Sequence, residues 1–166
     1  TWAVHYQTGE KIPQEYITKI HEAANFQSGY QNDRQLSFGL VDMAWHSVTS
    51  PVNGSIQAFE NQAMAPTESF LPVDSSCFST GFGHIFGGGY AAGYYSYKWA
   101  EVLDADAFSV FKQQGIYDQA TAESFRKNIL EKGGSEHPMI LYKRFRGQEP
   151  TIDALLERSG LKSKSE

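Results

Sequence analysis

A sequence of 166 residues with 40% hydrophobic and 20% charged residues has the length and composition of one globular domain. The net charge of −5 argues against a nucleic-acid-binding protein, because such a protein needs a basic surface toward the phosphates. No apolar run is long enough to cross a membrane, so we expect neither nucleic acid nor a membrane among its partners.

Both ends of the sequence indicate a piece of a larger protein. The first residue is Thr1 rather than Met, and the opening stretch TWAVHYQTGEK reads as the last turns of a helix whose beginning is missing, with a first turn at Gly9. The far end, residues 162–166, is a polar tail of the kind that frays. The sequence has no charged and apolar leader, and its single cysteine, Cys77, cannot form an internal disulfide, which together favour a cytoplasmic location. We therefore expect an excised C-terminal segment.

Apolar residues at helical spacing predict helices over most of residues 13–65. Pro13 suits the first turn of a helix, and the polar stretch QSGYQNDRQ (27–35) is expected to break that helix. The next helix, 36–48, carries so wide an apolar surface that we expect it to be buried. Asn53-Gly54 then predicts a turn, and a shorter helix is expected at about 55–65.

A long segment without helical periodicity follows at 66–90. Prolines interrupt it between Pro66 and Pro72, and Ser, Thr and Gly fill much of the rest. A structureless run of this length inside a compact domain is usually functional or disordered. Four phenylalanines argue for a loop packed onto the protein, parts of which pair as short β-strands: Phe70, Phe78, Phe82 and Phe86.

The remaining residues predict a long helix at about 91–113 and three shorter ones. Their first and last turns are marked by capping residues and glycines: Asp118 to Gly133, Ser135 to Gly147, and Thr151 to Gly160. At the last of these, Leu161 after Gly160 fits a Schellman ending. The predicted fold class is all-α.

The stretch HIFGGGYAAGYYSYKW (84–99) predicts a loop wrapped around a ligand. Three consecutive glycines cost conformational entropy unless the backbone must turn sharply or approach something closely. On a helix, Tyr90, Tyr94 and Tyr97 fall within about 60° of arc, so their hydroxyls point one way. Three apolar or aromatic residues fall toward another side, where they can supply packing: Tyr95, Trp99 and Val102. The alternative is a tyrosine-rich core helix whose hydroxyls reach solvent.

Nucleotide and metal sites find no support in the sequence. The glycine run lacks the third glycine of a dinucleotide fingerprint and the Lys-Ser/Thr of a P-loop. The histidines show no H-E-x-x-H spacing and have no cysteine partners, so no metal site can be assembled from them. His84 differs from the other histidines because it borders the glycine loop.

The stretch FGHIFGGGYAAGYYSYKW closely resembles the glycine-tyrosine loop and following helix of the thimet oligopeptidase and peptidyl-dipeptidase family of zinc metallopeptidases. HYQTGEKIPQE, LVDMAWH and GGSEHPMILYKRFRGQEPTIDALLERSGL resemble the same family in the right order, so the resemblance covers essentially all of the sequence. It implies that residues 1–166 are the C-terminal helical part of a thermolysin-like zinc peptidase domain. The form GGGYAAGYY is more like the loop of the bacterial peptidyl-dipeptidases (dipeptidyl carboxypeptidases), which release C-terminal dipeptides. The loop of the oligopeptidases reads nearer GGYDAQYYGY.

The resemblance also implies a mechanism. In this family, zinc is held by two histidines of an H-E-x-x-H helix and a later glutamate, and the glutamate of the motif is the general base. None of these residues is in the sequence, so the zinc ligands are expected upstream of Thr1 and no metal is expected in this segment alone. The partners implied are short peptide substrates and the upstream part of the same polypeptide.

The opposite wall of the substrate cleft is expected in this segment. By position, Tyr97 is the phenol that stabilises the oxyanion of the tetrahedral intermediate, with Tyr90 and Tyr94 as further donors and His84 as another substrate contact. Within the cleft loop 66–90, three residues are expected to let the loop move over the bound peptide: Gly87, Gly88 and Gly89. The alternative to an enzyme is a non-catalytic helical module that binds peptides, which the absence of an upstream H-E-x-x-H motif would favour.

Overall fold

The computed structural model describes residues 3–162, and all regular secondary structure in this range is helical. The helices are α1 (Gln14–Ala23), α2 (Ser28–Ser47), α3 (Ile56–Met64), α4 (Phe78–Gly81), α5 (Gly83–Gly87), α6 (Ser96–Gln114), α7 (Gln119–Phe125), α8 (Pro138–Arg146) and α9 (Asp153–Arg158). A 3-10 turn, η1 (Ala65–Thr67), extends α3, and a π-helical turn, η2 (Arg126–Leu130), extends α7. The predicted all-α class is confirmed, and no described helix is long and apolar enough to span a membrane.

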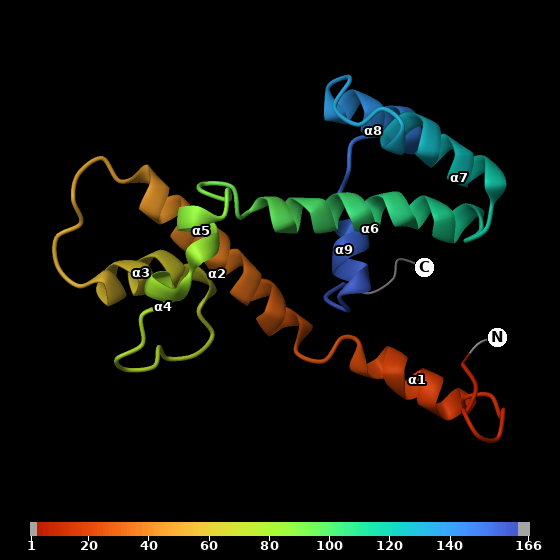
Figure 1. The fold of residues 1–166 in the computed structure, drawn as a ribbon, viewed down its shortest axis with the longest axis horizontal. Helices are drawn as coiled ribbons and strands as arrows, with labels where there is room; N and C mark the ends of the chain where they lie inside the picture. The colour runs from red at the N-terminus through yellow and green to blue at the C-terminus, as the bar shows by residue number, and fades with distance from the viewer. Residues whose placement is uncertain (1–2, 163–166) are drawn as a thin grey trace.

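The helices form two groups that the long helix α6 connects (Figure 1). At one end of α6, helices α3, α4 and α5 lie around α2, whereas α7 and α8 lie on one side of α6 and α9 lies on the other. Helix α1 extends away from both groups and buries none of its residues. The segment between α5 and α6, which holds the tyrosines, therefore lies where the two groups meet.

An aromatic core holds the first group together. Val41 of α2 and Ile85 of α5 are fully buried there, with Phe82 between α4 and α5. Phe38 stacks on Phe78 with ring centroids 4.8 Å apart. This core confirms the packing expected for two of the four loop phenylalanines, whereas the other two, Phe70 and Phe86, are 70% and 56% exposed.

A buried carboxylate fixes α4 to α3. Glu60 is only 2% exposed, and its oxygens accept hydrogen bonds from the backbone N–H groups of Phe78 (2.6 Å) and Ser79 (2.7 Å). Burial acts to raise the pKa of Glu60, but the hydrogen bonds from Ser79, Phe78 and Cys77 outweigh it and lower that pKa. The backbone N–H groups at the start of α4 are thus satisfied by an ionised side chain.

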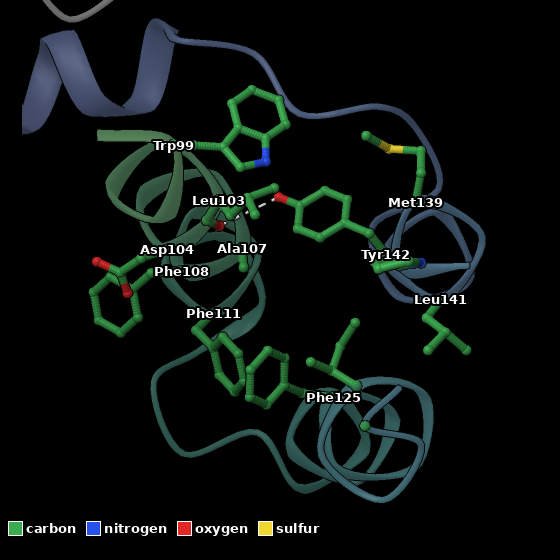
Figure 2. Close-up of a pocket in the computed structure, with 13 residues that line it drawn as sticks. Trp99, Leu103, Asp104, Ala107, Phe108, Phe111, Phe125, Met139, Leu141 and Tyr142 are labelled. Atoms are coloured by element: carbon green, nitrogen blue, oxygen red, sulfur yellow. Dashed lines mark hydrogen bonds between the residues drawn. The ribbon is translucent and has the colours of Figure 1, made fainter. Parts of the chain in front are cut away.

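The second group is joined by a buried ion pair between α6 and α8. Asp106 is 2% exposed and accepts hydrogen bonds from the Tyr142 hydroxyl (2.6 Å) and from Nε of Arg146 (3.0 Å). Next to this pair lies an apolar hollow of about 520 Å³ between α6, α7, η2 and α8 (Figure 2). The rings of Phe111 and Phe125, both part of its lining, pack edge to face with centroids 5.9 Å apart (Figure 2).

Residues 3–12 correct the first sequence expectation. They form no helix but a tight turn closed by an antiparallel bridge between Val4 and Lys11. The N–H of His5 donates to the carbonyl of Glu10 (2.8 Å), and Gly9 adopts a φ of 72°, which glycine tolerates without steric cost. The apolar residues of this stretch gave no information on the turn, which depends on the glycine.

The expected helix break at 27–35 is also wrong in its extent. The chain turns at Gln27, with a φ of 54°, and α2 already begins at Ser28. Polar side chains at the start of α2 find hydrogen-bond partners there. The Ser28 hydroxyl donates to the carbonyl of Ser159 near the end of the chain (2.6 Å), and the Asn32 side chain donates to the carbonyl of Ser28 (2.8 Å). The helix buries one face only: Leu36, Leu40 and Met43 are between 38% and 46% exposed.

Four further features differ from the expectations. The segment 66–90 contains the short helices α4 and α5, and the described part of the chain has no strand there. Helix α6 begins at Ser96 rather than at residue 91, and α9 begins at Asp153 rather than at Thr151. The cap of α8 is His137, whose Nδ1 accepts from the N–H of Met139, because Pro138 starts the helix.

Other boundary signals are confirmed. Asp118 caps α7 by accepting from the N–H of Thr121 (2.7 Å), and α8 ends at Gly147 with a φ of 83°. At the end of α9, the N–H of Leu161 donates to the carbonyl of Leu156 (2.9 Å), as in a Schellman ending. The polar tail lies mostly outside the described residues, although Lys162 contacts Asp153.

Candidate functional site

The three consecutive glycines occupy three different backbone environments. Gly87 is the last residue of α5, and a Cβ there would meet nothing within 4 Å. A Cβ on Gly88 would lie 2.9 Å from the carbonyl oxygen of His84, which is closer than real Cβ atoms come. Gly89 has a φ of 80°, which side chains of L-residues rarely tolerate. Glycine is therefore required at Gly88 by space and at Gly89 by backbone conformation.

A turn, rather than the predicted helix, carries the first tyrosines. Residues 91–95 form consecutive turns in which the N–H of Gly93 donates to the carbonyl of Tyr90 (2.8 Å). Ala92 adopts a φ of 53°. Tyr90 and Tyr94 consequently precede α6, and only Tyr97 belongs to the helix.

The turn nevertheless brings the predicted tyrosines together. The rings of Tyr90 and Tyr97 are stacked with centroids 5.2 Å apart, and those of Tyr94 and Tyr97 are 5.0 Å apart. His84 joins them from α5, with its ring 5.7 Å from that of Tyr90. These four residues, called the phenol cluster below, lie together as the sequence predicted, although through a turn and not through one helical stripe.

The phenol cluster is anchored on one side and open on the other. Tyr94 packs against Phe82 (5.0 Å between centroids) and Phe38 (5.8 Å), which belong to the aromatic core. Tyr97 is 39% exposed, and His84 is also exposed. A ligand thus has access to the Tyr97 side of a cluster whose position the core fixes.

Two residues expected to pack behind the tyrosines do not do so in the described chain. Tyr95 is 60% exposed and Trp99 is 47% exposed, whereas Val102 is buried as expected. Trp99 lines the apolar hollow instead (Figure 2). The prediction assumed that residues 91–95 are helical, which would put these three side chains on one face of the helix. Residues 91–95 form a turn instead, so the three residues do not share a face.

The neighbouring groups keep the phenols protonated. A hydrogen bond with the Tyr90 hydroxyl raises the pKa of Tyr97, and burial and the adjacent phenols raise it further. Burial raises the pKa of Tyr94, with a smaller opposing effect of the Arg34 charge. Since a free phenol already has a pKa of about 10, both hydroxyls are proton donors at neutral pH. The cluster can therefore stabilise an anion or a developing negative charge.

One functional candidate was missed by the sequence reasoning. Asp42 is fully buried in α2, and its carboxylate accepts hydrogen bonds from the N–H groups of Ala92 and Tyr94. The available signal was the aspartate in the middle of the apolar run LVDMAWH, because a charged residue in a buried stripe needs partners. Nothing in the sequence identified those partners.

The described residues do not form a metal site. Among residues 3–162, no three His, Cys, Asp or Glu side chains converge in a way that could hold a metal ion. The apolar hollow at α6 and α8 lies apart from the phenol cluster, and its lining is mostly hydrocarbon (Figure 2). The cluster is the stronger candidate because convergent proton donors, and not size, determine what a site can do chemically.

Comparison with known proteins agrees with a peptidase. The model of Peptidase family M3 matches residues 1–161. The chain belongs to this family of peptidases.

Relatives in this peptidase family include oligopeptidases and dipeptidyl carboxypeptidases. Oligopeptidase A of Escherichia coli (strain K12) is 48% identical over 159 residues, or 95% of this chain and 23% of that protein. Organellar oligopeptidase A, chloroplastic/mitochondrial, of Arabidopsis thaliana is 43% identical over 96% of this chain and 21% of that protein. Dipeptidyl carboxypeptidase of Salmonella typhimurium is 40% identical over 96% of this chain and 24% of that protein.

Two facts follow from these alignments. The chain spans about a quarter of the length of the curated relatives that it matches. The identity to the oligopeptidase from Escherichia coli exceeds that to the dipeptidyl carboxypeptidase, whereas the loop pattern GGGYAAGYY had suggested the reverse. A distinction that depends on a few loop residues carries less weight than identity over the whole chain.

Proposed function

We propose that the intact protein hydrolyses short peptides and that this chain supplies the wall of the cleft that binds substrate and stabilises the oxyanion. The observation that carries the proposal is the phenol cluster: four potential proton donors converge, and two of them, Tyr97 and His84, are open to solvent, in a chain of a peptidase family. The alternative of a peptide-binding module without hydrolysis lacks an explanation for phenols gathered around one open position.

In this proposal, each residue of the cluster has a distinct role. The Tyr97 hydroxyl donates a hydrogen bond to the carbonyl oxygen of the scissile bond, where negative charge develops in the tetrahedral intermediate. Tyr90, stacked on Tyr97, orients that hydroxyl and acts as a second donor. Tyr94 and His84 contact the peptide on either side, and Gly88 and Gly89 allow the backbone path that brings these two residues together.

The family resemblance also implies a zinc ion, which we assign to residues outside this chain because the described residues form no metal site. When bound, such an ion supplies Lewis-acid activation of water or of the carbonyl. The contribution of this chain is then hydrogen-bond donation and substrate orientation from the other wall.

The substrate class that we propose is short peptides, since the relative from Escherichia coli with 48% identity is named Oligopeptidase A. We further propose that the protein cleaves them at internal bonds. Release of C-terminal dipeptides, which the loop pattern predicts, remains the second candidate. The compartment stays a prediction, because the Arabidopsis relative is named chloroplastic/mitochondrial rather than cytoplasmic.

The test uses the intact protein and an internally quenched peptide. We expect hydrolysis that stops when a chelator removes the metal and returns when zinc is added back. Mass spectrometry of the products separates the two candidates, because a peptidyl-dipeptidase releases only dipeptides from the C-terminus of its substrate. Peptide binding without hydrolysis in the zinc-loaded protein would contradict the proposal and support the binding module.

A further inference from the structure

The carboxylate of Asp42 is the centre of a hydrogen-bond network between α2 and the tyrosine turn. It is fully buried, and Oδ1 accepts from the N–H of Ala92 while Oδ2 accepts from the N–H of Tyr94, both at 2.9 Å. From the next turn of α2, Nδ1 of His46 lies 2.8 Å from Oδ1. Hydrogen bonds to an ionised acceptor are stronger than those between neutral groups, so both carboxylate oxygens bind the turn firmly.

The turn needs such an anchor because its backbone is strained. Ala92 has a φ of 53°, which costs free energy for any residue with a Cβ and persists only when the surroundings determine it. Gly39 of α2 lies beside the turn, where a Cβ would be in ordinary van der Waals contact with the Cα of Tyr95 at 3.7 Å. The Asp42 bonds on either side of Gly93 hold this strained segment against α2 (Figure 1).

Asp42 determines the position of the phenols without touching them. It binds the backbone N–H of Tyr94, and the carbonyl of Tyr94 accepts from the N–H of Tyr97 (3.2 Å) at the start of α6. A shift of the Tyr94 backbone therefore moves both rings, whose centroids are 5.0 Å apart. We propose that Asp42 is a positioning residue, which fixes Tyr94 and Tyr97 in the geometry for oxyanion stabilisation. This inference rests on the proposed function.

The direct test is Asp42→Asn in the intact protein. Asparagine keeps the size of the side chain but loses the charge and one acceptor, so its NH₂ group must face a backbone N–H. Because misplacement by about 1 Å can cost about 10²-fold in rate, we expect kcat to fall by about 10- to 100-fold. KM should stay within about twofold, since the displaced hydroxyl acts mainly in the transition state.

The matched control is Asp106→Asn. Asp106 is an equally buried aspartate with tertiary partners, Tyr142 and Arg146, but it contacts no part of the phenol cluster. It reports what the same substitution costs through general destabilisation. Equal losses of kcat in the two variants, or wild-type kcat in Asp42→Asn, would overturn the proposal.

A double variant tests whether Asp42 acts through Tyr97. If it does, Asp42→Asn combined with Tyr97→Phe should lower kcat hardly more than Tyr97→Phe alone, because the hydroxyl to be positioned is already gone. Multiplication of the two single effects would mean that Asp42 acts independently and would contradict the inference.

Amide hydrogen exchange tests the anchor without activity or substitution. In the wild-type protein, the N–H groups of Ala92 and Tyr94 should be protected, whereas the N–H of Ala91 in the same turn should exchange faster. Equal exchange of the three amides would overturn the proposal even if Asp42→Asn does not fold. If the protein hydrolyses no peptide but these amides are protected, the proposed function fails while the anchor itself stands.

Discussion

Tyr97 combines exposure with a raised pKa. Its hydroxyl is accessible to a ligand, and the hydrogen bond with Tyr90 is the main reason why its pKa is above the usual value. The rings of the two tyrosines stack, and because the hydrogen bond raises the pKa of Tyr97, the Tyr97 hydroxyl is its donor and Tyr90 its acceptor. A phenol in this state is a hydrogen-bond donor throughout the neutral range and loses its proton only in strong alkali.

The first prediction concerns the alkaline limit of activity. Tyr97 can donate a proton only while it is protonated, that is, below its pKa. Deprotonation of Tyr97 should therefore not lower the kcat of the intact protein until the pH exceeds about 10. Tyr90→Phe removes the main cause of the raised pKa and should move the alkaline fall of kcat to lower pH. The measurement is kcat against pH with a parallel absorbance titration of tyrosinate. Identical alkaline limits in wild type, Tyr90→Phe and the control Tyr95→Phe would contradict it.

At the scale of elements, α5 and the turn after it set the geometry that the tyrosines need. The chain leaves α5 through Gly88 and Gly89, turns at Ala92 and enters α6 at Ser96. This short path reverses the chain over α2 and places three rings within stacking distance of one another.

The second prediction compares alanine at the three glycines. Gly89→Ala forces a side chain into a φ of 80°, at a cost of roughly 1–2 kcal/mol. Gly88→Ala places its Cβ against the carbonyl of His84. If this strain energy raises the free energy of the transition state by its full amount, each of these two variants should lower kcat/KM by about tenfold or more. Gly87→Ala, with open space around it, should stay within about threefold of wild type. A loss that is largest for Gly87→Ala would contradict this assignment and favour loop mobility as the role of the glycines.

The elements that the sequence predicted correctly are those with local signals. Asp118, Gly147 and Gly160 each mark a helix end at which the closing hydrogen bonds span three to five positions, and all three are found as expected. The positive φ of Ala92 has no such local signal, so the predicted helix ran through the turn. The N–H of Ala92 donates to Asp42, fifty residues earlier in the chain, and a contact over that distance cannot be read from spacing.

The candidate site was predictable for a different reason. Periodicity grouped Tyr90, Tyr94 and Tyr97 on one helix face, which is the wrong local structure, but the resemblance to a peptidase family assigned them to one site. The structure brings them together through the turn. The correct grouping thus came from the motif, whereas the geometry required the tertiary fold.

At the scale of the whole molecule, the phenol cluster lies at the junction of the two helical groups. The core of Val41, Phe82 and Ile85 supports it from one group, and α6 carries Tyr97 into the other. Lys98, next to Tyr97, reaches back to Asn32 of α2, and Ser28 bonds to Ser159 before the last turn of the chain. These contacts connect the groups, so the position of the cluster depends on the fold as a whole and not on the loop alone.

The most direct test of the central claim is the kcat of Tyr97→Phe in the intact protein, measured beside Tyr95→Phe. The first variant removes one hydroxyl and keeps the ring that stacks on Tyr90, whereas the second removes an exposed hydroxyl outside the cluster. If Tyr97 donates to the oxyanion, kcat should fall by about 10²–10³-fold with KM little changed. Tyr95→Phe should be close to wild type. Near-wild-type kcat in both variants would contradict the account and leave the tyrosines as packing residues.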